Sequence, residues 1–271
     1  MPFVAWAPAV QCDAFTAESS RGGSDETSSA VTSQCGAGGR TGNRGPTRAA
    51  LVIPALDEEA AIGAVVGAVP RGAVDDVVVV DNGSTDRTAA VARAAGARVV
   101  AEPRRGYGAA CWAGVQALGR EIAIVAFLDG DGSQDPAELP RVLEPIAAAR
   151  ADLVLGVRRF VGADATHPWH AVVGTRTVSA LVRWRFGVAV GDIGPFRAIS
   201  RDALLHLDLR DRGVGWPVEM VVKAASQGLR IAQVDVTQRP RAAGRSKVAG
   251  TVWGSVRAGW RFLGLALRGA P

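Results

Sequence analysis

The stretch "IAIVAFLDGDGSQDP", residues 122–136, carries the strongest indication of the fold. Its apolar part runs directly into Asp129 and Asp131, each followed by a glycine, and a third acid, Asp135, stands before a proline. A continuous apolar run bounded by glycine and proline is typical of a strand that is buried on both faces of a sheet. Carboxylates repel one another and prefer water, so their clustering at the end of such a strand indicates either an ordinary acidic turn or a bound cation.

The same order of apolar strand, polar turn and amphipathic helix recurs on both sides of this stretch. Strands are expected at 49–53, 76–80, 97–101, 122–128 and 152–156, and helices at about 58–69, 85–95, 107–119 and 137–149. Short apolar strands that alternate with helices favour an α/β fold, in which helices cover both faces of a mostly parallel, Rossmann-like sheet. Ligands of such sheets bind at the carboxyl ends of the strands.

Composition favours a soluble, cytoplasmic protein. The chain has 271 residues, of which 48% are apolar and 21% charged, as in globular proteins with a large core. Its three cysteines are far apart and form no disulfide or zinc pattern, which favours a reducing compartment. Residues 1–48 are expected to be a disordered extension, because most of them are Ser, Thr, Gly and other residues that bury little apolar surface. The folded domain is expected at 49–249.

The C-terminal part is strongly basic. From Arg239 onward the chain has six arginines, one lysine and no acid. Within an expected amphipathic helix at 250–271, one apolar stripe contains Trp253, Val256, Trp260, Leu263 and Leu267. Such a stripe suits either the membrane interface or packing in a core. No nucleic-acid-binding motif accompanies the basic charge, so nucleic acid is not an expected partner.

Polar residues follow four consecutive expected strands, as "PALDEE", "DNGSTD", "EPRRGYG" and "DGDGSQD". Helix capping explains about one such residue per turn, but it does not explain the acids at 81, 129 and 131. A dinucleotide fingerprint is not indicated, because the near match "GYGAAC" follows the third strand, and the chain has no P-loop motif. An Asp-x-Asp pair at a strand end suits Mg²⁺ or Mn²⁺ that bridges to a diphosphate.

Four segments that overlap these turns resemble, in order and spacing, the inverting family 2 glycosyltransferases of GT-A fold. They are "VIPALDEEAAI", "VVVVDNGSTDRT", "RRGYGAACWAGV" and "FLDGDGSQDP". Downstream, "LGVRR", "RTVS", "DIGPFRAISRDAL" and "GRSKVAGT" resemble the polyprenyl-phosphate branch, which includes the dolichyl-phosphate mannose and glucose synthases. The resemblance covers roughly residues 49 to 262, which is essentially the whole expected fold.

The resemblance implies roles for individual residues. Those expected to bind the nucleotide are Pro54, Leu56, Glu58, Asp81 and Asp129, and those expected to hold the metal are Asp129, Asp131 and Ser133. The chain departs from the family pattern in two of these places. It has Leu56-Asp57-Glu58 where the family usually has Tyr-Asn-Glu, and Ser133 where the synthases have Gln, with Gln134 next to it.

The expected catalytic residues are Asp131, Arg158 and Asp192, and those expected to bind an acceptor phosphate are Arg176, Arg197, Arg245 and Lys247. Because a phosphate acceptor is already an anion, it needs positioning rather than a general base. A hydroxyl acceptor would need a base, for which Asp192 and Glu219 are the candidates.

These residues together predict a metal-dependent, inverting transferase. It would move a hexose from UDP-glucose or GDP-mannose to an undecaprenyl, decaprenyl or dolichyl phosphate, as a peripheral protein on the inner face of the cell membrane. One alternative is a soluble transferase with a small phosphorylated or hydroxylated acceptor. Another is a sugar-nucleotide binding module without turnover. The departures at Leu56 and Ser133 would favour it, as would Gly194-Pro195, which stands where the synthases have Ser-Gly.

Overall fold

The computed structural model describes residues 47–161 and 169–241. Several expectations lie outside these residues. They are residues 1–46 of the expected extension, the expected helix at 250–271, and the expected phosphate-binding roles of Arg245 and Lys247. In the described part of the chain, no helix is long and apolar enough to cross a membrane.

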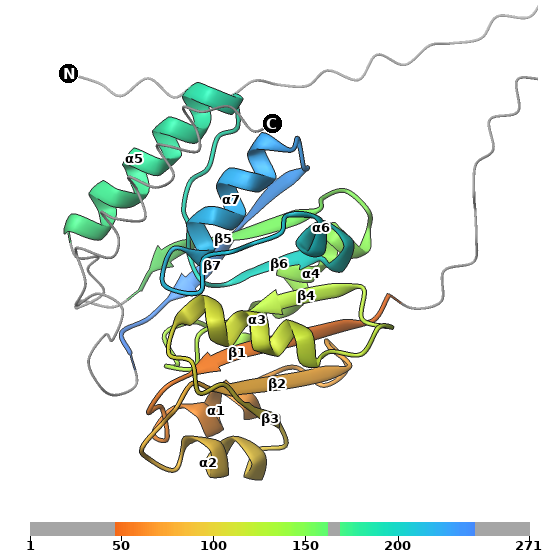
Figure 1. Ribbon diagram of the computed structural model, residues 1–271, viewed down its shortest axis with the longest axis vertical. Helices are drawn as coiled ribbons and strands as arrows, with labels where there is room; N and C mark the ends of the chain where they lie inside the picture. Colours follow the sequence, from red (N-terminus) through yellow and green to blue (C-terminus); the bar gives the residue numbers. More distant parts are fainter. Residues whose placement is uncertain (1–46, 162–168, 242–271) are drawn as a thin grey trace, which may run out of the picture. The chain divides into compact units, whose positions relative to one another are not determined.

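The described residues form a seven-stranded sheet in the order β3-β2-β1-β4-β6-β5-β7 (Figure 1). Its strands are β1 (Ala49–Ala55), β2 (Asp76–Asp81), β3 (Arg98–Ala101), β4 (Ile124–Phe127), β5 (Leu153–Phe160), β6 (Arg197–Ser200) and β7 (Ile231–Gln238). Strand β6 is antiparallel to both of its neighbours, and all other paired strands are parallel. The sheet is therefore mixed but mostly parallel.

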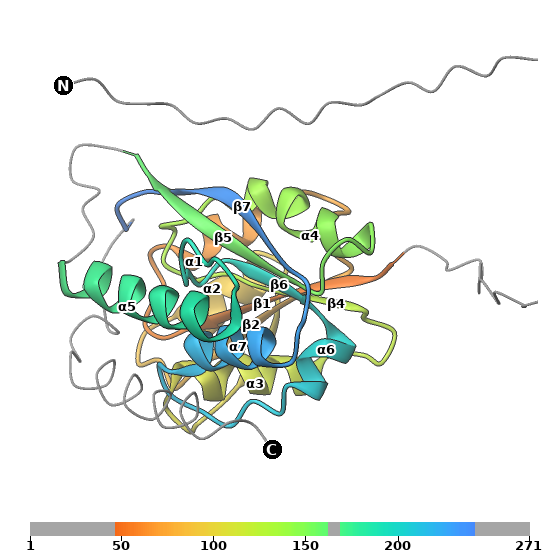
Figure 2. The ribbon, with the colours of Figure 1, turned by 90° about the horizontal axis from the view of Figure 1, so that it is seen from above.

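Helices cover both faces of this sheet. They are α1 (Ile62–Gly67), α2 (Thr88–Ala94), α3 (Tyr107–Ala117), α4 (Leu139–Ala147), α5 (Trp169–Phe186), α6 (Arg201–His206) and α7 (Trp216–Ser226), with a 3₁₀ turn at Pro136–Glu138. One apolar core joins α3, α6 and α7 to the sheet, and a second joins α1, α2 and α4 to its other face. Figure 2 shows α4 on the side of the sheet opposite to α3 and α7.

The five expected strands are all present, and four expected helices are present in shorter form. The sequence analysis did not place β6, β7, α5, α6 or α7. Strand β6 has only four residues, "RAIS", which is too short for a clear alternation of apolar and polar side chains. The sheet is mostly parallel, as expected, and β6 is the antiparallel strand among those described.

The direction of β6 brings further residues to the edge where the parallel strands end. Because β6 runs opposite to β4 and β5, its amino-terminal end lies beside their carboxyl ends. The segment that precedes β6, with Asp192 in it, therefore lies beside the end of β5, which carries Arg158. The acidic residues that follow β4 belong to the same edge.

A cluster of aromatic side chains joins this edge to α3 and α7. Trp216, which is 1% exposed, packs against Trp112 and Phe127 with ring centroids 6.2 and 6.4 Å away. The guanidinium of Arg212 lies over the Trp112 ring, 5.1 Å from its centroid. Trp216 thus connects α7 to the end of β4, two residues before Asp129.

Candidate active site

A pocket of about 200 Å³ lies at the carboxyl edge of the sheet, where β1, β2 and β4 end. Five of the residues expected to bind nucleotide or metal line it: Pro54, Leu56, Glu58, Asp129 and Asp131. The rest of its lining is Ala55, Asn82, Arg105, Gly106, Tyr107, Ala110, Gly130, Val214 and Arg241. The structure thus brings the predicted donor-site residues together, with the exceptions of Asp81 and Ser133, which do not line the pocket.

The turns after β2 and β3 are joined by Asn82. Its side-chain amide donates to the carbonyls of Glu102 and Arg104 at 2.9 and 2.8 Å, and its oxygen accepts from the Gly106 N–H at 2.8 Å. Gly106 has φ +147°, and a Cβ there would lie 2.2 Å from the carbonyl oxygen of Arg212. This position therefore requires glycine. The contacts fix the pocket wall without help from a ligand.

The turn after β1 is held against the start of α2. The Asp57 N–H donates to Ser84 Oγ at 2.9 Å, and the Thr85 N–H donates back to Asp57 Oδ1 at 2.6 Å. Asp57 itself has a left-handed φ of 47°. Asp81 Oδ1 accepts from the Ser84 N–H at 2.9 Å, so this carboxylate also shapes the turn. Its expected contact with a nucleotide base stays a prediction.

The two acids after β4, Asp129 and Asp131, lie close enough for their negative charges to repel each other. The Asp131 side chain is 4% exposed, with Oδ1 accepting from the Ser133 N–H at 2.9 Å and Oδ2 3.0 Å from Arg241 Nη2. Burial, and then the charge of neighbouring Asp131, raise the pKa of Asp129 to about 7, although nearby arginines oppose the rise. Additional positive charge at this place would stabilise both carboxylates.

Both acids fit a divalent cation only if other ligands complete its shell. In the described parts of the chain, no group of three or more His, Cys, Asp or Glu side chains is arranged to hold a metal alone. Mg²⁺ commonly takes one or two carboxylates and completes its octahedron with phosphate oxygens and water. Asp129 and Asp131 in an open pocket match that pattern. The expected role of Ser133 stays a prediction, as does that of Gln134, whose buried side-chain amide has no hydrogen-bond partner.

Arg158 and Asp192 form a two-pronged ion pair beside the pocket edge. Arg158 Nε lies 2.6 Å from Asp192 Oδ2 and Nη2 lies 2.7 Å from Oδ1, with side chains 14% and 10% exposed. Burial alone would raise the pKa of Asp192, but the hydrogen bonds and charge of Arg158 outweigh it, so the pKa is lowered. A carboxylate held in this way is a poor proton acceptor near neutral pH.

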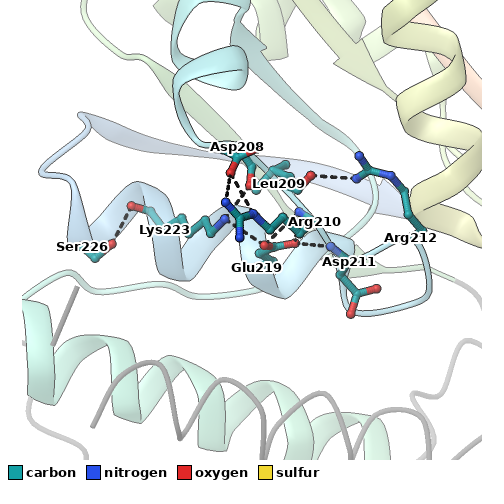
Figure 3. Close-up of polar contacts among 8 residues, drawn as sticks. All are labelled: Asp208, Leu209, Arg210, Asp211, Arg212, Glu219, Lys223 and Ser226. Carbon is teal, nitrogen blue, oxygen red and sulfur yellow. Dashed lines mark hydrogen bonds and ion pairs between the residues drawn. The ribbon is translucent and has the colours of Figure 1, made fainter. Parts of the chain in front are cut away.

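The structure contradicts the alternative role of Glu219 as a general base (Figure 3). Its carboxylate accepts from the Arg210 N–H at 3.0 Å and the Asp211 N–H at 2.7 Å, and it lies 3.0 Å from Lys223 Nζ. These donors occupy the lone pairs of a carboxylate. Glu219 does not line the pocket, and it instead holds the loop that leads to Val214, which does.

Comparisons with known proteins identify the family. A family model described as "Glycosyl transferase family 2" matches residues 50–207, more than half of the chain. The chain belongs to glycosyltransferase family 2. The predicted enzyme class, a hexosyltransferase, is therefore confirmed, and the module without turnover is not supported.

Relatives within and around the family differ in what they are named for. An uncharacterized glycosyltransferase of Mycobacterium tuberculosis is 46% identical over 206 residues, covering 76% of this chain and 92% of the relative. An undecaprenyl-phosphate mannosyltransferase of Micrococcus luteus is 34% identical, covering 82% of this chain and 96% of the relative. The solved glucosyl-3-phosphoglycerate synthase of M. tuberculosis, with Mn²⁺, UDP and product bound, has a TM-score of 0.64 at 27% identity, covering 79% of this chain and 80% of that one. The fold of this family 2 enzyme is thus GT-A-like.

Of the residues expected to bind an acceptor phosphate, the described part of this family 2 enzyme contains Arg176 and Arg197, and the two differ in their surroundings. Arg197 is 1% exposed, and its guanidinium donates to the carbonyls of Gly194 and Pro217. This burial argues against direct contact between Arg197 and a phosphate, and it indicates support of the segment before β6. Arg176 lies on the exposed surface of α5.

Several residues of the candidate site were not predicted from the sequence. Arg241 is the most important, because it contacts Asp131 directly. The basic run from Arg239 onward was the available signal, but its first members were assigned no role. Asn82 stood in a quoted motif without a role, although an Asn that follows a strand end is a common turn-forming residue.

Proposed function

We propose that this family 2 enzyme transfers a hexose from a nucleotide sugar to a polyprenyl phosphate, in a metal-dependent reaction with inversion at the anomeric carbon. Family membership supports the hexosyl transfer. The pocket and its acids support the nucleotide sugar and the metal. The phosphate acceptor is supported by the contacts of Asp192 and Glu219, the two candidate bases, whose carboxylates are already bound by other groups of the protein. This observation carries the proposal.

On the donor side, Asp129 and Asp131 would hold Mg²⁺ or Mn²⁺. When bound, the cation would neutralise the charge that develops on the departing diphosphate. Pro54, Leu56 and Glu58 line the pocket next to these acids and would face the nucleoside. The related glucosyl-3-phosphoglycerate synthase was solved with UDP and Mn²⁺, which agrees with such a site.

On the acceptor side, the expected general bases are already bound. Both oxygens of Asp192 are held by Arg158, and the carboxylate of Glu219 is held by backbone amides and Lys223. An anionic phosphate oxygen can attack the anomeric carbon without losing a proton. The bond from that carbon to the diphosphate oxygen then breaks, and its electron pair leaves with the nucleoside diphosphate. No base is needed for this exchange.

Helix α5 supports a lipid-linked acceptor. Its sequence contains no Asp or Glu, and Trp184 is 74% exposed beside Arg183 and Arg185. Val173 is 54% exposed on the same helix. Tryptophan and arginine together suit the interface of an anionic membrane. The relative named as an undecaprenyl-phosphate mannosyltransferase points to the same class of acceptor.

A second candidate is transfer to a small phosphorylated acceptor in solution. The likeness to glucosyl-3-phosphoglycerate synthase favours it, because that enzyme is named for such a product. The two candidates share the donor site and differ only in the acceptor.

A transfer assay on the purified protein separates them. Radiolabelled UDP-glucose and GDP-mannose are supplied separately with Mn²⁺ or Mg²⁺, each with decaprenyl phosphate or 3-phosphoglycerate. We expect label in the organic phase with one donor and the lipid acceptor, and its loss with EDTA. Label only in a water-soluble anionic product would reject the lipid acceptor and support the second candidate. No transfer to either acceptor would contradict both.

Binding to vesicles tests the membrane surface on α5. Trp184→Ala should reduce binding to phosphatidylglycerol vesicles by about tenfold, because an interfacial tryptophan contributes roughly 1–2 kcal/mol. Leu205→Ala is the matched control, since Leu205 is an exposed apolar residue, 48% exposed, on α6 instead. Equal binding by the two variants would show that α5 does not contact the membrane.

A further inference from the structure

The segment after β7 is fastened along the acidic loop that follows β4. Gln238 pairs with Gln134 in a β-bridge, and the Arg239 N–H donates to the Ser133 carbonyl at 2.7 Å. The Arg239 side chain adds an ion pair, with Nη2 3.0 Å from Asp135 Oδ2. The chain is thereby guided past the acidic loop, and two residues later it reaches the pocket.

At that point Arg241 neutralises Asp131. Its Nη2 lies 3.0 Å from Asp131 Oδ2, and the side chains are 30% and 4% exposed. A buried carboxylate without a counter-charge costs several kcal/mol, and the single hydrogen bond from the Ser133 N–H offsets only part of this. Arg241 therefore provides at Asp131 the positive charge that a bound metal ion would otherwise provide.

We propose that Arg241 is the resident counter-ion of Asp131, and that a divalent cation enters the site by displacing its guanidinium from this carboxylate. The inference rests on the proposed function, because the cation belongs to the proposed transfer reaction. It assigns Arg241 a positioning role that goes beyond that function, since the residue would set how tightly the donor site binds metal before a nucleotide is bound.

Competition follows from the geometry. A cation bound to Asp131 Oδ2 would lie close to a guanidinium on the same oxygen, and charges of +2 and +1 at such a separation repel by several kcal/mol even when partly screened. Arg241 is 30% exposed and can turn toward solvent, whereas the contacts of Arg239 need not break. The displaced guanidinium would stay near the pocket, because Arg241 is one of its lining residues.

Mn²⁺ binding to the nucleotide-free protein tests this proposal. Free Mn²⁺ is followed by electron paramagnetic resonance during titration of the wild type, Arg241→Gln and Arg239→Gln. We expect Arg241→Gln to bind Mn²⁺ about tenfold more tightly than the wild type, a typical size for coupling between two ligands of one site. Arg239→Gln removes the same charge from the same segment, but Arg239 is 54% exposed and pairs with Asp135 instead of Asp131, so the change should stay below about twofold.

A charge-retaining variant completes the comparison. Arg241→Lys should bind Mn²⁺ within about threefold of the wild type, because the counter-charge remains although the fork geometry is lost. Equal or weaker Mn²⁺ binding by Arg241→Gln than by Arg239→Gln would overturn the proposal. Tighter binding without any glycosyl transfer would leave it intact and contradict only the proposed function. No Mn²⁺ binding by any variant would contradict both.

Trypsin provides a measurement that needs no variant. Trypsin cleaves after arginine when the side chain is free, and Arg239 is protected by the proline that follows it. We expect Mg²⁺ to speed cleavage after Arg241 several-fold, as its guanidinium leaves Asp131, while cleavage after Arg71, which is exposed in the turn before β2, keeps its rate. An unchanged rate after Arg241 would show that the cation does not displace it.

Discussion

Glu219 and Asp131 are two buried carboxylates that the fold treats in different ways. The Glu219 side chain is 6% exposed and that of Asp131 is 4% exposed. Glu219 is held by backbone amides of a neighbouring loop and by Lys223 one helical turn away. Asp131 has one backbone amide and a partly exposed arginine from the segment after β7. Burial alone therefore does not separate a structural acid from a functional one.

The difference lies in what would be lost if a ligand replaced the partner. Replacing the partners of Glu219 would leave part-buried backbone amides without acceptors, which costs up to about 1–3 kcal/mol each. Replacing the partner of Asp131 only releases a side chain that water can solvate. The carboxylate with the exchangeable partner is the one placed in the pocket.

Asp131→Asn should produce the largest effect on activity. The variant removes the charge that is expected to hold the metal, so transfer should fall by about a thousandfold or more, as for the loss of a strong electrostatic contribution. The free energy of unfolding should change by less than about 1 kcal/mol, because Arg241 can turn to solvent. Transfer rates at saturating Mg²⁺ and urea unfolding measure the two quantities. Full activity in this variant would remove Asp131 from the site.

Glu219→Gln should have the opposite profile. We expect a loss of about 2 kcal/mol in the free energy of unfolding, because a buried ion pair is broken while part of the amide bonding survives. In a protein of this size, the melting temperature would fall by about 5 °C. Transfer per folded molecule should fall by less than about tenfold. A loss of a hundredfold or more with normal stability would restore Glu219 as a general base.

Asp192→Asn tests a second acid that is bound by a side chain, but its partner Arg158 is only 14% exposed, against 30% for Arg241. The lowered pKa of Asp192 means that its stabilisation is present above the unfolded pKa, near 3.9, and is lost as pH falls through the folded value. The variant should therefore be less stable than the wild type by about 1–2 kcal/mol at pH 7. The difference should shrink below about pH 4, as measured by urea unfolding across pH. A difference that does not depend on pH would mean that the carboxylate charge is not the cause.

Asp135→Asn should have the smallest effect. Asp135 pairs with Arg239, whose side chain is 54% exposed, and its Oδ1 caps the turn at the Ala137 N–H. An asparagine keeps the cap and an exposed ion pair contributes little, so the free energy of unfolding should change by less than about 0.5 kcal/mol. Urea unfolding at low and high salt checks this. A change above 1 kcal/mol in the free energy of unfolding would show that the ion pair between Arg239 and Asp135 stabilises the fold more than its exposure suggests.

The sequence predicted that the residues after the strands meet at one edge of the sheet, because the prediction used local signals. Each strand end carries its polar residues in the turn that follows directly, and parallel strands bring those turns to one edge. Leu56, Glu58, Asp129 and Asp131 thus reached the pocket as expected. Glu219 was misjudged, although its spacing of four residues from Lys223 on a helix was readable as an ion pair.

The contacts of Arg158 and Arg241 were not predictable in the same way. The pair of Arg158 with Asp192 depends on the antiparallel insertion of β6 between β4 and β5. The pair of Arg241 with Asp131 depends on β7 lying at the edge of the sheet and ending against a loop that is about a hundred residues earlier in the chain. Such contacts follow from topology, which the periodicity of a single segment does not contain.

The tryptophans beside the pocket make the molecule its own optical reporter. Trp112 and Trp216 are 6.2 Å apart between ring centroids, with the Arg212 guanidinium over both rings and the ring of Phe127, the last residue of β4, 6.4 Å from that of Trp216. Rigidly held indoles in an asymmetric setting give near-ultraviolet circular dichroism, which vanishes when tertiary packing loosens. Because Arg212 lies in the loop that leads to Val214, binding in the pocket that shifts this loop would change that spectrum. Donor binding could then be followed by light alone, without a label on enzyme or sugar.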